Sequence, residues 1–112
     1  MTKAILIVAL LLSKVALAGD QTGTVLDVRV SSRTIGVGNP THVQLSGTWN
    51  GRPGCATAGY WAIDTDTAVG KNMLATLLLA QATGKMITFW GSGLCTLRTD
   101  MESAYQVALA TQ

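Results

Sequence analysis

The segment "DTDTAVGKNMLATLLLAQATGK", residues 64–85, constrains the fold most, because it has the ends of a helix but is apolar or small on nearly every face. The "DTD" at its start supplies side-chain oxygens and negative charge for the first-turn amides of a helix. Gly84 suits the left-handed residue that follows a helix. These ends predict one helix over about residues 67–83.

Both faces of this helix are apolar. A helix that is apolar on two sides is buried on both, and no second helix is expected in the chain to cover the second face. The stripe expected to pack on a sheet consists of Met73, Leu74, Leu77 and Leu78. The opposite face, which we expect to form the interface of a homo-oligomer, consists of Ala75, Leu79 and Ala82.

The segments around the helix read as strands. In residues 22–32, Leu26, Val28 and Val30 alternate with a second set of residues that is mostly polar, a period of two that indicates a half-buried strand. The second set is Val25, Asp27, Arg29 and Ser31. Similar arguments predict strands at residues 41–49, 60–64, 85–91 and 103–110. The predicted fold is mainly β with one helix, in the order β-β-β-α-β-β. That order is the layout of the OB-fold, a small five-stranded barrel.

The N-terminal residues have the layout of a secretory signal peptide. Lys3 precedes the apolar run "AILIVALLL", and "ALA" precedes Gly19. The apolar run is too short to span a bilayer, although a membrane anchor is the alternative interpretation. Cleavage of residues 1–18 would leave a single OB-fold domain, residues 19–112, with no membrane span. We therefore expect a secreted or periplasmic protein.

Removal of the signal peptide also changes the charge balance. Without Lys3 and Lys14, the remaining 94 residues carry six basic and six acidic side chains. Nucleic-acid binding depends on a surplus or cluster of basic residues that neutralises phosphates. The sequence therefore disfavours nucleic acid as a partner.

Cys55 and Cys95 are the only cysteines. An even number of cysteines in an exported chain predicts a disulfide. Closing a loop of this length contributes about 3 to 4 kcal/mol in the chain-entropy model. Two cysteines without neighbouring histidine or acidic ligands are a poor zinc site.

Catalytic and metal-binding patterns are weak. His42 is the only histidine, on a predicted outward strand face, and no Ser-His-Asp or Cys-His arrangement is indicated. Calcium could be imagined at the acidic residues, but helix capping accounts for residues 64–66 and a solvated loop for Asp100 and Glu102. We expect no enzyme activity, no metal and no cofactor.

The order of elements, the single cysteine pair and the pattern "C…WAID…GK…LLLAQATGK…GSGLC" resemble small exported bacterial OB-fold proteins. These include the pentameric B subunits of A–B toxins of the subtilase-cytotoxin and pertussis type. The resemblance implies a ring of five subunits packed through their helices, sugar binding on the barrel surface, and an exported partner subunit. It assigns no individual sugar-binding residue in this chain.

OB-folds bind ligands on the face of the second and third strands and with the loops after the first and fourth strands. An indole can stack on a sugar ring, and charged side chains can bind its hydroxyls. Core packing is the alternative role for each of the three tryptophans. The residues predicted to bind a ligand are Arg33, Asn39, Trp49, Arg98 and Asp100.

The sequence thus predicts a secreted, non-catalytic binding subunit that recognises a glycan as a homo-oligomeric ring. The alternative is a structural or protein-interaction module of the bacterial cell envelope with no sugar ligand.

Overall fold

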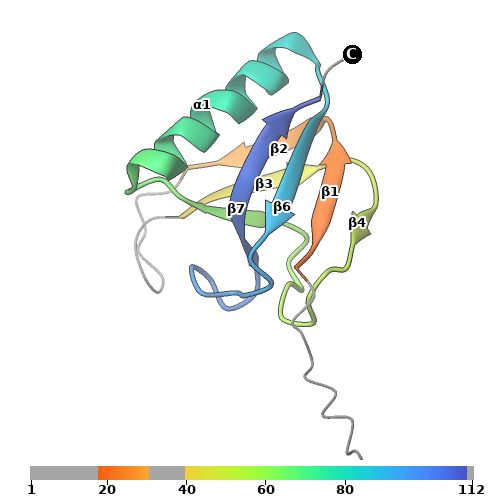
Figure 1. Cartoon of the computed structure of the whole chain (residues 1–112), viewed down its shortest axis with the longest axis vertical. Coiled ribbons are helices and arrows are strands. Elements are labelled where there is room, and N and C mark those ends of the chain that lie inside the picture. The colour runs from red at the N-terminus through yellow and green to blue at the C-terminus, as the bar shows by residue number, and fades with distance from the viewer. Residues whose placement is uncertain (1–17, 31–39, 111–112) are drawn as a thin grey trace, which may run out of the picture.

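The computed structural model describes residues 18–30 and 40–110, and the structural statements below concern these residues. The described chain is mainly β with one helix, as predicted (Figure 1). The elements are β1 (Asp20–Gly23), β2 (Val25–Arg29), β3 (Pro40–Leu45), β4 (Trp49–Asn50), β5 (Trp61–Asp64), α1 (Ala68–Thr83), β6 (Ile87–Gly91) and β7 (Glu102–Leu109).

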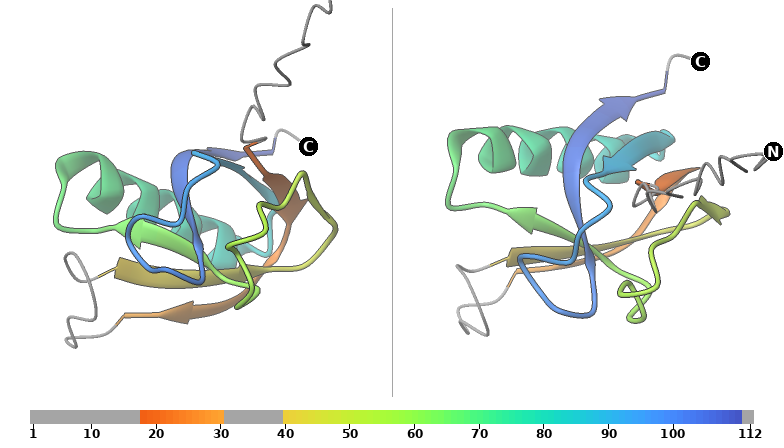
Figure 2. Two further views of the ribbon diagram at one scale, coloured as in Figure 1. Left: turned by 90° about the horizontal axis from the view of Figure 1, so that it is seen from below. Right: turned by 60° about the horizontal axis from the view of Figure 1, so that its bottom comes forward.

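The seven strands form one curled sheet, a half-barrel, in the order β2-β3-β5-β7-β6-β1-β4. Strands β5 and β7 pair in parallel, and the other neighbours pair antiparallel. Only Thr24 separates β1 from β2, yet the two strands lie near opposite ends of this order. The sheet therefore curls back on itself, and α1 lies against it (Figure 2).

The predicted order β-β-β-α-β-β has three strands before the helix and five strands in all. This number is wrong, because the described chain has five strands before the helix and seven in all. Each predicted segment does contain strand, but residues 22–32 and 41–49 are each divided. The two breaks lie next to each other in space, because the Ser46 hydroxyl accepts a hydrogen bond from the Thr24 amide at 2.8 Å. Gly23 approaches so closely that a Cβ there would lie 1.9 Å from the Ser46 carbonyl oxygen. This close crossing bends both segments.

Helix α1 occupies nearly the predicted range, but its N-cap differs from the prediction. Thr67 is the cap, and its hydroxyl accepts a hydrogen bond from the Gly70 amide at 2.9 Å. The "DTD" of residues 64–66 precedes the cap, where the Asp64 carbonyl accepts a hydrogen bond from the Thr67 hydroxyl. At the other end Gly84 has the predicted left-handed conformation, with φ of 68°.

The core lies between α1 and the inner face of the sheet. Its buried residues are Val43, Leu45, Trp61, Ile63, Met73, Leu77, Ala80, Ile87 and Phe89. Leu74 is partly buried against them, which agrees with its predicted place on the side of the helix that faces the sheet. The assignment of Leu78 to that side is wrong, because its side chain is 44% exposed. Each helical residue turns the side chain by about 100°, which carries Leu78 away from the buried stripe of Met73 and Leu77.

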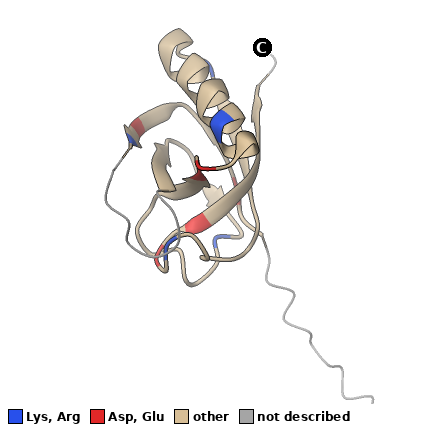
Figure 3. Ribbon diagram, turned by 90° about the vertical axis from the view of Figure 1, so that its left-hand side faces the viewer, with Lys and Arg blue, Asp and Glu red and all other residues tan. Residues whose placement is uncertain are grey.

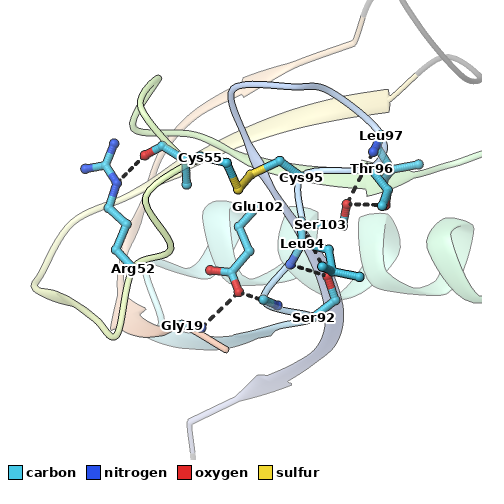
Figure 4. Close-up of a disulfide and its surroundings, with 12 residues drawn as sticks. Gly19, Arg52, Cys55, Ser92, Leu94, Cys95, Thr96, Leu97, Glu102 and Ser103 are labelled. Atoms are coloured by element: carbon cyan, nitrogen blue, oxygen red, sulfur yellow. Dashed lines mark hydrogen bonds between the residues drawn. A yellow bond between two sulfur atoms is a disulfide. The ribbon is translucent and has the colours of Figure 1, made fainter. Parts of the chain in front are cut away.

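The predicted disulfide is confirmed. Cys55 and Cys95 are bonded, with their Cα atoms 6.2 Å apart, and the bond ties the β4–β5 loop to the β6–β7 loop (Figure 4). A disulfide suggests an oxidising, extracytoplasmic location. Within the described ranges, no helix is long and apolar enough to cross a membrane. The predicted signal peptide lies outside the described residues except for Ala18.

Candidate ligand-binding site

Trp90 lies on the outer face of the half-barrel. Along β6, Ile87 and Phe89 are fully buried, whereas the alternate residues Thr88 and Trp90 are partly exposed. Strand side chains alternate between the two faces of a sheet, so the Trp90 indole lies opposite the core. Trp90 is not among the residues predicted to bind a ligand, although its position one residue after Phe89 in a strand indicates the opposite face of the sheet.

Polar residues continue this line of Trp90 across neighbouring strands. Trp90 pairs with Asp20 on β1 and with Gln106 on β7, and Asp20 in turn pairs with Asn50 on β4. The Asn50 amide donates a hydrogen bond to Asp20 Oδ1 at 2.9 Å. We call the four residues Asn50, Asp20, Trp90 and Gln106 the outer row.

The outer row combines an aromatic ring with a carboxylate and two primary amides. In the adjacent row, the hydroxyls of Thr22 and Thr88 are 2.8 Å apart on the same exposed surface. An indole offers an apolar face, and the surrounding polar groups can donate and accept hydrogen bonds. The outer row can therefore bind a flat ligand that has one apolar face and many hydroxyls.

A groove of about 250 Å³ lies between α1 and β7, and Gln106 is one of the residues that line it. Its lining is mixed and includes Val69, Met73 and Tyr105. Pockets that enclose small molecules are usually about 300–1,000 Å³. The groove is smaller than that range, which favours binding on the open surface over enclosure.

Trp49, predicted to bind a ligand, is partly buried. Its ring stacks on Trp61 with the centroids 4.3 Å apart, and the Arg52 guanidinium lies over it at 4.9 Å. The two indole rings are too close for a guanidinium to fit between them, so Arg52 covers the face of Trp49 that points away from Trp61. Both faces of Trp49 are thus in contact with its own chain, and Trp61 is fully buried.

Arg98 and Asp100, the other predicted ligand residues in the described chain, lie together in the β6–β7 loop. Arg98 Nε is 3.4 Å from Asp100 Oδ1, although that oxygen accepts no hydrogen bond. The pair acts on half-buried His42, whose pKa lies below its ordinary value chiefly because of burial and secondly because of Arg98. Asp100 opposes this effect. Arg33 and Asn39 lie outside the described residues.

A second polar group adjoins His42. Arg29, its cross-strand neighbour, donates a hydrogen bond from Nε to Asp27 Oδ2 at 2.9 Å. The Tyr60 hydroxyl donates to the same carboxylate oxygen at 2.7 Å. The Tyr60 bond, followed by the Arg29 bond, holds the pKa of Asp27 below its ordinary value. These residues, with Arg98 and Asp100, form a charged surface on β2, β3 and the adjoining loops.

Glu102 was predicted to lie in a solvated loop, and that prediction is wrong. It begins β7 and is fully buried. Oε2 accepts hydrogen bonds from the amides of Gly19 and Gly93, both at 2.9 Å (Figure 4). Oε1 accepts one from Trp49 Nε1 at 3.2 Å. The charged side chain turns inward because it pairs across the sheet with Trp61.

The outer face of α1 is exposed and apolar. Leu78 and Leu79 are 44% and 53% exposed, and Lys71 is the only charged residue in the helix (Figure 3). Ala75 and Ala82 are exposed beside Leu79. The predicted oligomer interface thus lies on an accessible surface, and its role stays a prediction.

Within residues 18–30 and 40–110, no group of three histidine, cysteine or acidic side chains is arranged to hold a metal ion. Comparisons of the chain with protein-family models, curated proteins and solved structures find no match. What the structure supports is a small β-rich half-barrel with one helix and one disulfide, and no family is identified.

Proposed function

We propose that this protein is an exported, non-catalytic binding subunit that recognises a glycan through the outer row. The observation that carries the proposal is the outward indole of Trp90, flanked across the sheet by Asp20 and Gln106. Sugars present apolar C–H faces and hydroxyls, which an indole and polar side chains can bind together.

The strand order supports an OB-fold assignment within this proposal. If β1 and β2 are the two halves of one bent first strand, and β3 and β4 the two halves of a bent second strand, the sheet order runs first, second, third, fifth, fourth, first and second. OB-folds bind oligosaccharides on their barrel surface. The outer row differs from the usual OB-fold face, which corresponds here to β3 and β5. The charged surface overlaps that face only at β3.

We extend the proposal to a homo-oligomeric ring. The exposed Leu79 lies with Ala75 and Ala82 on a face that the protein's own sheet does not cover. Burying a leucine side chain is worth about 1.5–3 kcal/mol, and a closed ring repeats each contact at every interface. Multiple copies of a weak sugar site would also bind a cell surface with increased avidity.

A glycan array probed with the oxidised protein tests this function. For any glycan that binds, Trp90→Ala should weaken the affinity at least tenfold, equivalent to about 1.4 kcal/mol. Gln106→Ala should weaken binding with a change in folding stability within about 0.5 kcal/mol, as for other exposed positions. Unfolding midpoints of both variants control for damage to the fold.

Arg98→Ala is the matched variant on the charged surface. The outer-row proposal expects it to leave glycan affinity unchanged. Loss of binding in Arg98→Ala, with normal binding in Trp90→Ala, would move the site to the β6–β7 loop.

The alternative function is a structural or protein-interaction module of the cell envelope. The apolar outer face of α1 favours it, because that face suits a protein surface better than a sugar. Failure of the oxidised protein to bind any glycan would support this alternative.

A further inference from the structure

Glu102 is the only charged residue among the buried side chains of the described chain. The ion pairs found there are Arg29–Asp27 and Arg98–Asp100, and neither involves Glu102. Its carboxylate is instead bound by three uncharged N–H donors. A buried carboxylate without a cation is costly, because its hydration is lost and no opposite charge replaces it.

One of these donors is the backbone nitrogen of Gly19, the residue immediately after the predicted cleavage site. Gly19 is buried, and its nitrogen lies 2.9 Å from Glu102 Oε2. Its carbonyl accepts a hydrogen bond from the Gly91 amide at 2.8 Å, which fixes the residue at the end of β1. Ala18, by contrast, is exposed. The chain therefore leaves the interior at the bond that a signal peptidase is predicted to cut.

Glycine at positions 19 and 91 leaves room for the carboxylate. A Cβ on Gly19 would lie 2.4 Å from Glu102 Oε1, and a Cβ on Gly91 would lie 1.8 Å from Oε2. Distances below 3.0 Å would displace the carboxylate. The two glycines thus let the backbone nitrogen of residue 19 come within hydrogen-bonding distance of the buried Glu102 carboxylate.

We propose that cleavage between Ala18 and Gly19 creates an α-ammonium group that forms a buried ion pair with Glu102, so that processing completes the folded state. A signal peptidase and water break the amide bond. The water oxygen joins the Ala18 carboxyl group, and the released Gly19 nitrogen takes up protons to become –NH3+. The new cation then occupies the position where an amide N–H already points at Oε2.

The ion pair with Glu102 can form only if the chain begins at Gly19. One additional residue before Gly19 would restore the amide and move the ammonium by about 3.8 Å. At a buried site the interaction of opposite charges is much stronger than in water. The processed chain should therefore be more stable than a chain extended by a single residue.

The first experiment uses the exported protein. Its intact mass should correspond to a chain that begins at Gly19. A free α-amine, with a pKa of about 7.7–8.0, normally reacts with acylating reagents before lysines, whose pKa is about 10.4. We expect the reverse order here, with exposed Lys71 and Lys85 acylated before the buried amine. A different N-terminus, or acylation of Gly19 first, would overturn the proposal.

The second experiment is a double-mutant cycle. One change inserts a serine between Ala18 and Gly19, with the new terminus verified by mass, and the other is Glu102→Gln. The insertion should lower the unfolding midpoint markedly with Glu102 present and much less with Gln at that position. Asp100→Asn, a change to the partly buried carboxylate two residues before Glu102, is the matched control and should show no coupling to the insertion. Equal effects of the insertion in both backgrounds would overturn the ion pair, and the acylation order decides the matter if Glu102→Gln does not fold.

Discussion

The inner and outer faces of the half-barrel use the same residue types for different purposes. On the inner face, Trp61 is fully buried and its Nε1 donates a hydrogen bond to Gln21 Oε1 at 2.9 Å. On the outer face, Trp90 is paired with polar residues and is partly exposed, although its neighbour Phe89 lies in the core. A step of one residue along a strand thus separates a side chain that holds the fold from one that can bind a ligand.

Helix α1 shows the same contrast two residues apart. Leu77 is fully buried against the sheet, whereas Leu79 is 53% exposed. Substitutions on inner faces should affect folding, and those on outer faces should affect binding or association. The following predictions test this difference.

Leu77→Lys should have the largest effect. It removes the burial of a leucine, worth about 1.5–3 kcal/mol, and adds a buried charge that has no partner. Because small domains have only about 5–15 kcal/mol of stability, we expect loss of the cooperative unfolding transition in circular dichroism. A folded variant with a normal transition would contradict the placement of this face in the core.

Cys95→Ser should be an exception to the difference between inner and outer faces. The disulfide lies in partly exposed loops and yet stabilises the fold. Loss of a native disulfide in a small exported domain costs about 2–5 kcal/mol. Urea unfolding of the variant and of the oxidised wild type measures this difference. Two alkylatable thiols in unreduced wild-type protein would contradict the disulfide itself.

Leu79→Lys should dissociate the proposed oligomer and leave a folded monomer, because the position faces outward. Light scattering and circular dichroism measure these two results. Gln81→Lys is a control at an exposed helical position outside the proposed interface, and it should leave the mass unchanged. A wild-type protein that is monomeric at micromolar concentration would refute the ring.

The smallest effect is expected from the partly exposed Asp27 group. Its pKa is lowered chiefly by the Tyr60 hydroxyl, so its contribution to stability is present above the ordinary aspartate value of 3.8. That contribution is lost as the pH falls through the lower pKa of the folded state. Tyr60→Phe should therefore make the unfolding midpoint less sensitive to acid below the ordinary value. An unchanged acid dependence would show that the bond contributes nothing measurable in solution.

Local patterns in the sequence were sufficient for most of the secondary structure. The alternation in residues 41–49 and the glycine at position 84 act within a few residues, so they predict a strand and a helix end without knowledge of the fold. The cysteine pair could be predicted because only one pairing is possible. The break at Thr24 could not, because it depends on contact with Ser46, which is distant in sequence.

The candidate site was less predictable than the fold. The predicted residues that the structure describes, Trp49, Arg98 and Asp100, do not form one site with the outer row. That row joins four strands whose register is decided by pairing across the sheet. No local pattern records which residue of β1 or β7 will lie beside Trp90.

The sequence by itself determined a mainly β chain with one capped helix and one disulfide, because periodicity, capping and a unique cysteine pair are local or combinatorial properties. Only the tertiary structure decided that Glu102 is buried beside Gly19, 83 residues away. A charged side chain at the end of a polar loop normally lies in water. Here two glycines and an inward strand position bring the backbone to the carboxylate, and such a meeting of distant segments arises only when the sheet closes.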